Sequence, residues 1–134
     1  FWPEMVSRVN DIIRATGAKL VISSDCRRGR TISQLQDLLE SYDCIGEIIG
    51  CTPEAEQVVD AWIPITDLEQ ERCLEIQDWL SKHPEVTSWV VIDDLDLSAL
   101  RRFVQTDHRT GISDKNVQET IEILIDKEQH NARN

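Results

Sequence analysis

The sequence has few basic residues. Its 134 residues include 14 lysines and arginines against 25 aspartates and glutamates, so the formal net charge is −11 at pH 7. A general nucleic-acid binder should be basic, because a negative surface repels the phosphate backbone. The composition therefore argues against such a binder. It favours an acidic protein whose charge serves solubility, and it leaves room only for a small local basic patch.

Long apolar runs and paired metal ligands are also missing. No run approaches the roughly 20 residues of a membrane helix, and the longest, residues 89–92, has the length of a strand. The cysteines form no CxxC pair and lie far from the three histidines, which argues against a structural zinc site. The four are Cys26, Cys44, Cys51 and Cys73. Free thiols are typical of a reducing compartment. We therefore expect an intracellular protein, cytoplasmic or inside an organelle, without a membrane-spanning segment.

The length fits one domain that buries a core of its own. The first residue is Phe1 rather than Met, and no charged segment followed by an apolar one begins the sequence. We therefore expect a processed chain or a fragment of a longer one. Within a single domain over residues 1–134, an irregular excursion is expected at 51–67, which holds two prolines, and a polar, frayed tail at 128–134.

Helical and strand patterns alternate along the chain. Apolar residues at helical spacing predict helices over residues 3–16, from Gly29 or Thr31 to 42, over 68–82, and after Ser113. Short apolar runs predict strands over residues 19–23, 44–50, 88–92 and 102–105. Gly17 is expected to end the first helix. Strands alternating with helices predict an α/β fold, with a mainly parallel sheet covered by helices on both faces.

Polar side chains follow two of the predicted strands. Ser23 and Ser24 end the first, and Asp93, Asp94 and Asp96 follow the third. Ligands of open α/β sheets bind at the carboxyl ends of strands. Hydroxyl groups beside basic residues can hold a phosphate, and clustered carboxylates can hold Mg²⁺. If the two strand ends lie side by side, they form a site for magnesium and phosphate.

Each of these signals also has a plainer interpretation. Serines after a strand commonly cap a helix or close a turn, and paired acids commonly form a polar turn. The repulsion within the sequence DDLD at residues 93–96 favours a metal or a basic partner there. Arg72 is either a surface arginine, solvated or in a salt bridge, or a cation that stabilises a transferred phosphoryl group.

Two further groups of residues leave alternatives open. Arg27, Arg28 and Arg30 form the one dense basic run, which either contacts phosphate or simply offsets an acidic protein. Trp2 and Trp62 lie in less regular segments, where they either contact a protein partner or pack in the ordinary way.

Four motifs in order resemble the haloacid dehalogenase (HAD) superfamily, most closely the HAD domain of Swiss-Army-knife RNA-repair proteins. Residues 21–27 read VISSDCR, similar to VISSxWR in that subfamily. Residues 72–80 read RCLEIQDWL, similar to RGxEIxxWL, and residues 93–96 read DDLD, similar to DDxD. The strand FVQ at 103–105 precedes a turn GIS at 111–113, where the subfamily has a Gly-Leu-Thr turn and a final helix.

The resemblance implies a HAD-like Rossmannoid fold and Mg²⁺-dependent phosphoryl transfer. Ser23 would match the phosphate-binding hydroxyl of the second motif, with Ser24 as the alternative one residue along. Arg72 would match the cation of the third motif. The acids of the fourth motif that hold the metal would be Asp93 and Asp94, with Asp96 as an auxiliary acid.

Two departures from the family pattern matter. Cys26 stands where the serine motif has tryptophan, and no residue of the chain matches the first motif. In that motif, DxDx, an aspartate at the end of the first strand attacks the phosphate. The corresponding strand would lie between the strand ending at Ser23 and the strand ending at Ile92.

The sequence therefore predicts a HAD-type Mg²⁺-dependent phosphohydrolase domain, part of a larger chain and inactive without the upstream aspartate. Its substrate would be a phosphorylated small molecule or a nucleic-acid end. The alternative is a non-catalytic HAD-like pseudoenzyme, a structural or accessory subunit whose partners are other proteins of a larger assembly. A third interpretation is a domain that trims or senses RNA ends.

Overall fold

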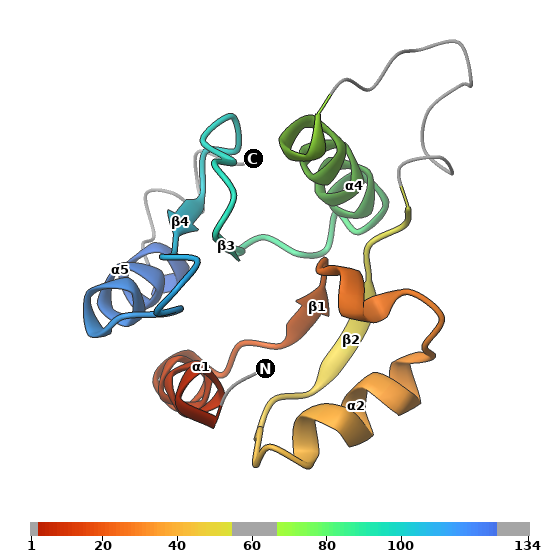
Figure 1. Ribbon diagram of the computed structural model, residues 1–134. Coiled ribbons are helices and arrows are strands. Elements are labelled where there is room, and N and C mark those ends of the chain that lie inside the picture. The colour runs from red at the N-terminus through yellow and green to blue at the C-terminus, as the bar shows by residue number, and fades with distance from the viewer. Residues whose placement is uncertain (1–2, 55–66, 126–134) are drawn as a thin grey trace, which may run out of the picture.

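The structure is a computed structural model that describes residues 3–54 and 67–125 (Figure 1). The first part contains α1 (Pro3–Thr16), β1 (Leu20–Ile22), the 3₁₀ helix η1 (Asp25–Arg27), α2 (Ile32–Glu40) and β2 (Ile48–Cys51). The second contains α4 (Leu68–Lys82), β3 (Val91–Asp93), β4 (Phe103–Gln105) and α5 (Asp114–Ile125). Most of the predicted excursion, the predicted tail, Trp2 and Trp62 lie outside the described residues.

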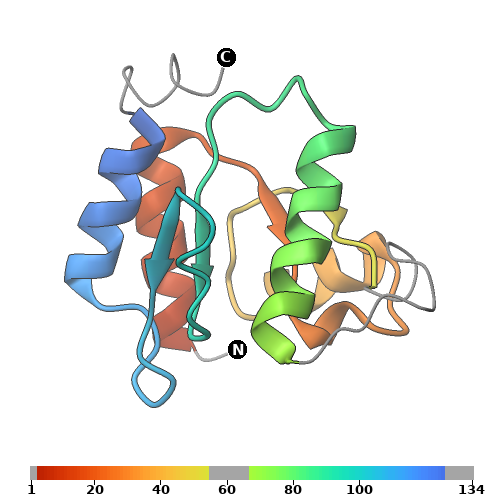
Figure 2. The ribbon, with the colours of Figure 1, turned by 90° about the horizontal axis from the view of Figure 1, so that it is seen from above.

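The strands form two parallel pairs. β1 pairs with β2, and β3 pairs with β4. Figures 1 and 2 show β1 and β3 as the inner strands, with β2 and β4 outside them. Helix α4 lies on one face of the strands, and α1, α2 and α5 lie on the other. The predicted α/β fold, with parallel strands and helices on both faces, is therefore confirmed.

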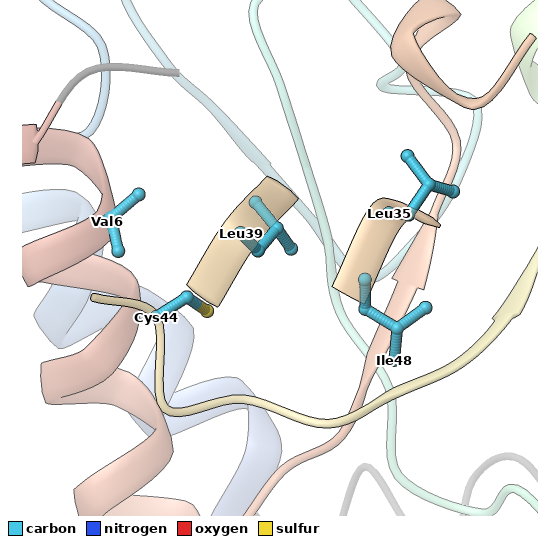
Figure 3. Close-up of a cluster of buried hydrophobic side chains, with 5 residues drawn as sticks. All are labelled: Val6, Leu35, Leu39, Cys44 and Ile48. Atoms are coloured by element: carbon cyan, nitrogen blue, oxygen red, sulfur yellow. The ribbon is translucent and has the colours of Figure 1, made fainter. Parts of the chain in front are cut away.

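Each strand pair has its own apolar core. Beside β1 and β2, the buried residues are Val6, Leu35, Leu39, Cys44 and Ile48 (Figure 3). Around β3, they are Ile76, Val91, Leu97 and Leu100. Helices connect the two halves: α1 packs against α5 on one face, and α4 reaches both strand pairs on the other. Ile76 of α4 joins the β3 core, while Trp79 lies so close to β2 that a Cβ at Gly50 would be 3.0 Å from its indole nitrogen.

Local hydrogen bonds explain where the helices begin and end. Thr31 and Gln34 form a capping box at the start of α2, so Thr31 rather than Gly29 caps this helix. The Ser113 hydroxyl accepts from the Asn116 amide at the start of α5, as predicted. α1 ends at Thr16, and Gly17 follows with φ +70°, a conformation that favours glycine.

The strands are shorter than predicted, and two are displaced. Residues 44–47 are not part of β2, because Asn10 of α1 holds this segment as a loop. The Asn10 side chain accepts from the Ile45 amide at 2.9 Å and donates to the Asp43 carbonyl at 2.9 Å. β3 begins only at Val91 and extends through Asp93, which pairs with Gln105. Asp93 is therefore the last residue of the strand rather than the first residue after it.

Arg102 is a buried arginine that joins β4 to α5. Its guanidinium donates to the Ile123 carbonyl in the last turn of α5 at 2.7 Å and lies 5.7 Å from the centre of the Trp89 ring. Helix carbonyls near a C-terminus attract cations. We therefore expect Arg102→Ala to lower the free energy of unfolding by about 3 kcal/mol, because buried carbonyls lose a charged donor.

Urea unfolding followed by circular dichroism measures this effect. The matched control is Arg101→Ala at the exposed neighbouring position, where a change of no more than about 0.5 kcal/mol is expected. Equal losses for the two variants would contradict a structural role for Arg102.

Among the helices in residues 3–54 and 67–125, none has the length and apolar character needed to cross a membrane.

Candidate functional site

The ends of β1 and β3 are connected by charged side chains. Arg27 follows β1 in η1, Asp93 ends β3, and Arg72 and Glu75 come from α4. All four residues are buried. We call Arg27, Arg72, Glu75 and Asp93 the buried charge cluster. Because it joins the two strand ends that carry the predicted site residues, it shows that these ends share one edge of the molecule.

Arg27 fixes the backbone around the end of β1. Its Nη1 donates to the carbonyls of Ser23 at 3.1 Å and Ser24 at 3.0 Å. Its Nε donates to the Thr52 carbonyl at 3.0 Å, and its Nη2 to the Pro53 carbonyl at 3.3 Å. The side chain therefore ties the serine segment to the residues that follow β2. Neither proposed role for Arg27, phosphate contact or surface charge, fits a guanidinium occupied in this way.

Glu75 lies between the two arginines of the cluster. Its Oε1 is 2.9 Å from Nη2 of Arg27 and 3.9 Å from Nε of Arg72. Arg72 in turn places Nη1 2.7 Å from Oδ2 of Asp93. The cluster thus alternates positive and negative groups, which is what buried charges require if they are to remain ionised. Arg72 is buried, so it is not a surface arginine, although it does form salt bridges, as the plainer interpretation allowed.

Asp93 is a buried carboxylate whose neighbours shift its pKa in both directions. Burial raises its pKa above the usual 3.8, and a hydrogen bond with the Asp94 side chain raises it further. The Leu95 amide, which donates to Oδ1 at 3.0 Å, and the Arg72 guanidinium act in the opposite direction. A cation near Asp93 would favour its ionised form.

The two serines lie at the same edge, half-buried. Ser24 occupies the position before η1, but its hydroxyl caps no helix. Instead, Oγ of Ser24 is 2.9 Å from Sγ of Cys26, the residue that stands where the family has tryptophan. Helix capping therefore does not explain Ser24. The phosphate-binding roles of Ser23 and Ser24 stay predictions.

Asp94 and Asp96 are exposed and lie in the loop after β3. Oδ1 of Asp96 accepts from the Ser98 amide at 3.0 Å, and hydrogen bonds from the side chain and then the backbone of Ser98 lower the pKa of Asp96. This is the polar turn that such sequences commonly form. Among the described residues, no group of three or more His, Cys, Asp or Glu side chains could hold a metal ion. The metal-binding roles of Asp93, Asp94 and Asp96 stay predictions.

The contacts of the other two arginines of the basic run favour the interpretation that their charge offsets an acidic protein, rather than phosphate contact. The Arg28 side chain, 42 % exposed, pairs with Asp25 at 3.3 Å, Glu54 at 3.3 Å and Glu71 at 3.7 Å. Arg30 donates to the Cys26 carbonyl at 2.7 Å. These contacts describe a charged loop in an acidic protein.

The pKa shifts of two cysteines argue against a nucleophilic thiol at this edge. Burial raises the pKa of the Cys51 thiol, and nearby Arg27 offsets part of that effect. Burial also raises the pKa of Cys73, and neighbouring acids, Glu69 foremost, add to it. Because the thiolate is the nucleophilic form, both thiols are poor nucleophiles near neutral pH.

Sequence reasoning missed Glu75 as a site residue. Glu75 belongs to the motif RCLEIQDWL, but no role follows for it from the motif, because it stands among the apolar positions that define the buried face of α4. The signal that could have found it is its spacing: Glu75 follows Arg72 by three residues, so the two side chains share a helix face.

A comparison with protein families identifies the family of the chain. A family model described as the HAD domain in Swiss Army Knife RNA repair proteins matches residues 1–117. The matched range includes the serine segment, α4, β3 and β4, and ends within α5. No curated protein and no solved structure matches the chain.

Proposed function

The chain belongs to the family of HAD domains in Swiss Army Knife RNA repair proteins, and from this premise we propose that it is a Mg²⁺-dependent phosphohydrolase domain. Membership supports a HAD-type hydrolase domain, from a superfamily that acts on phosphorylated substrates. The observation that carries the finer proposal is the 2.7 Å ion pair between Arg72 and Asp93. It places the predicted cation and a predicted metal-binding acid at one edge, within a cluster that also reaches the serine segment.

In this proposal each of the predicted site residues has a separate role. The hydroxyl of Ser23, or of Ser24, donates to an oxygen of the substrate phosphate. Arg72 stabilises the negative charge that the phosphoryl group carries during transfer. Asp93 and Asp94 hold the metal, with Asp96 as an auxiliary acid.

The donor chemistry of these acids fits Mg²⁺. Magnesium in phosphoryl-transfer sites is commonly held by one or two carboxylates and completes its shell with water and phosphate oxygens. Asp93 and Asp94 supply two adjacent carboxylates, which is enough for such a site without a third protein ligand. When bound, the ion would supply Lewis-acid polarisation of the phosphate.

The nucleophile in this proposal is an aspartate on a further strand, as the family resemblance implies. Among the described residues, β1 pairs only with β2 and β3 only with β4. A strand inserted between β1 and β3 would therefore find backbone groups to pair with on both sides. Its aspartate would displace the substrate oxygen from phosphorus and form an acyl phosphate. The displaced oxygen takes up a proton and leaves as the substrate's alcohol. Water would then hydrolyse the acyl phosphate, a mixed anhydride, which releases phosphate and restores the carboxylate.

The direct test is hydrolysis by the natural full-length protein that contains this domain. We expect release of phosphate from p-nitrophenyl phosphate or from a terminally phosphorylated oligoribonucleotide, with loss of turnover in EDTA and recovery with Mg²⁺. Comparing the two substrates separates a small-molecule enzyme from one that acts on nucleic-acid ends.

Asp93→Asn should lower kcat about a hundredfold or more, because the metal loses a charged ligand. The control is Asp37→Asn on the exposed side of α2, which should leave turnover unchanged. Turnover that is independent of Mg²⁺, or full activity of folded Asp93→Asn, would contradict the proposal. No turnover at all would favour the non-catalytic accessory subunit.

A further inference from the structure

Glu75 is a carboxylate in an unfavourable place. Its side chain is only 3 % exposed, although it belongs to a helix whose other face is in contact with solvent. Removing a carboxylate from water costs several kcal/mol unless charges and hydrogen bonds compensate. Two arginines provide that compensation. Arg72 precedes Glu75 by three residues on the same helix, whereas Arg27 comes from η1, beside the other strand pair.

The two arginines serve different strand ends. Arg27 donates to the carbonyls of Ser23 and Ser24, so its position sets the position of the serine segment. Arg72 pairs with Asp93, so its position sets the position of the acid at the end of β3. Since Glu75 contacts both guanidinium groups, one carboxylate connects the serine segment to the acid.

The packing of α1 on α5 and of α4 on both strand pairs connects the two halves, but few of the described contacts join the two strand ends themselves. Among the described residues there is no ladder of backbone hydrogen bonds between β1 and β3, and the two apolar cores are separate. Asp25 lies 3.9 Å from both Arg27 and Arg72, as far as Glu75 lies from Arg72, but 68 % of the Asp25 side chain is exposed. Water screens an exposed pair of this kind strongly, whereas the pair of Glu75 and Arg27 is almost completely shielded. The buried pair is therefore the stronger connection.

We propose that Glu75 is a positioning residue of the phosphoryl-transfer site. It holds Arg27 and Arg72 in a fixed relation, so that the serine hydroxyls and Asp93 face the same phosphate. Glu75 touches neither substrate nor metal in this scheme. Its effect on catalysis rests on the proposed function, while its role in linking the two strand ends does not.

The linking role is tested by backbone amide NMR spectra of the full chain. Glu75→Gln keeps the shape of the side chain but cannot neutralise two guanidinium groups. We expect chemical-shift changes at both strand ends, around Ser24 and around Asp94. The matched control is Asp78→Asn, one turn along α4, where the carboxylate pairs with Lys82 of the same helix. Its changes should stay within α4.

Changes confined to α4 or to one strand end in Glu75→Gln would overturn the linking role. Glu75→Asp provides a second variant if the glutamine variant does not fold. It retains the charge on a shorter side chain, so smaller changes at the same two places are expected.

The catalytic consequence is tested by kinetics of the full-length protein. Glu75→Gln should lower kcat about ten- to a hundredfold with little change in KM, because misplaced groups weaken transition-state contacts more than substrate binding. Glu75→Asp should recover part of kcat. Unchanged kcat per folded molecule would overturn the positioning role. If the unsubstituted protein hydrolyses no phosphate ester, the proposed function fails, and the NMR spectra still decide whether Glu75 links the strand ends.

Discussion

Arg72→Ala is expected to lower kcat of the Mg²⁺-dependent hydrolysis about a hundred- to a thousandfold, the loss typical when a group that stabilises transition-state charge is removed. Arg72 is the buried cation that reaches the end of β3, where it pairs with Asp93 at 2.7 Å. Its removal takes positive charge away from the phosphoryl group. It also leaves the buried Asp93 carboxylate without the guanidinium of Arg72. The pKa of this carboxyl then rises further, and its binding of a metal weakens.

Steady-state kinetics with two further variants separate these effects from unfolding. Arg72→Lys keeps a positive charge but loses the second point of contact of the guanidinium, so a loss of about tenfold is expected. Lys82→Ala removes an exposed cation from the other end of α4 and should leave kcat unchanged. If folded Arg72→Ala keeps activity within about threefold of the natural protein, Arg72 does not stabilise the transferred group.

The largest loss of stability is expected from Arg27→Met. This substitution removes the donor of four hydrogen bonds to backbone carbonyls and leaves Glu75 without its nearest cation. Breaking a buried ion pair by removing one partner costs about 3–5 kcal/mol, because the remaining charge stays buried without compensation. A domain of this size has a total stability of about 5–15 kcal/mol, so the variant loses a large part of it.

Thermal and urea unfolding of paired variants measure this cost. The control is Arg28→Ala at the next position, where the partly exposed side chain makes surface ion pairs and a loss below about 1 kcal/mol is expected. The double variant Arg27→Met with Glu75→Leu should regain part of the lost stability, since it removes the uncompensated charge. A loss for Arg27→Met no greater than that for Arg28→Ala would contradict the structural role of the buried charge cluster.

Elements with a strong periodic pattern were predictable from sequence. The helix over residues 68–82 is found with the predicted bounds, and Gly17 and Ser113 lie at the predicted helix ends. Strand bounds were less accurate, because an apolar run does not show which of its residues pair. Residues 44–47 have the composition of a strand, but a side chain distant in sequence, Asn10, holds them in a loop.

Several residues of the candidate site were predictable from the sequence, but the contacts that join them were not. Motif order suggested that Arg72 and Asp93 belong to one site, and the structure brings them into contact. The burial of Arg27 and Glu75 could not be foreseen, because hydrophobic periodicity assigns charged residues to the surface unless a partner is known. Their partners come from different elements, so only the folded chain brings them together.

The burial of arginines changes the electrostatic field that an approaching ligand meets. Positive and negative groups nearly balance within the buried charge cluster, and Arg102 withdraws a further positive charge from the outside. The exterior is therefore at least as acidic as the net charge of −11 suggests. Long-range electrostatics slow the diffusional encounter with a phosphorylated substrate, and added salt should accelerate that encounter by shortening the Debye length. Capture of such a substrate then depends on short-range contacts at the edge where β1 and β3 end.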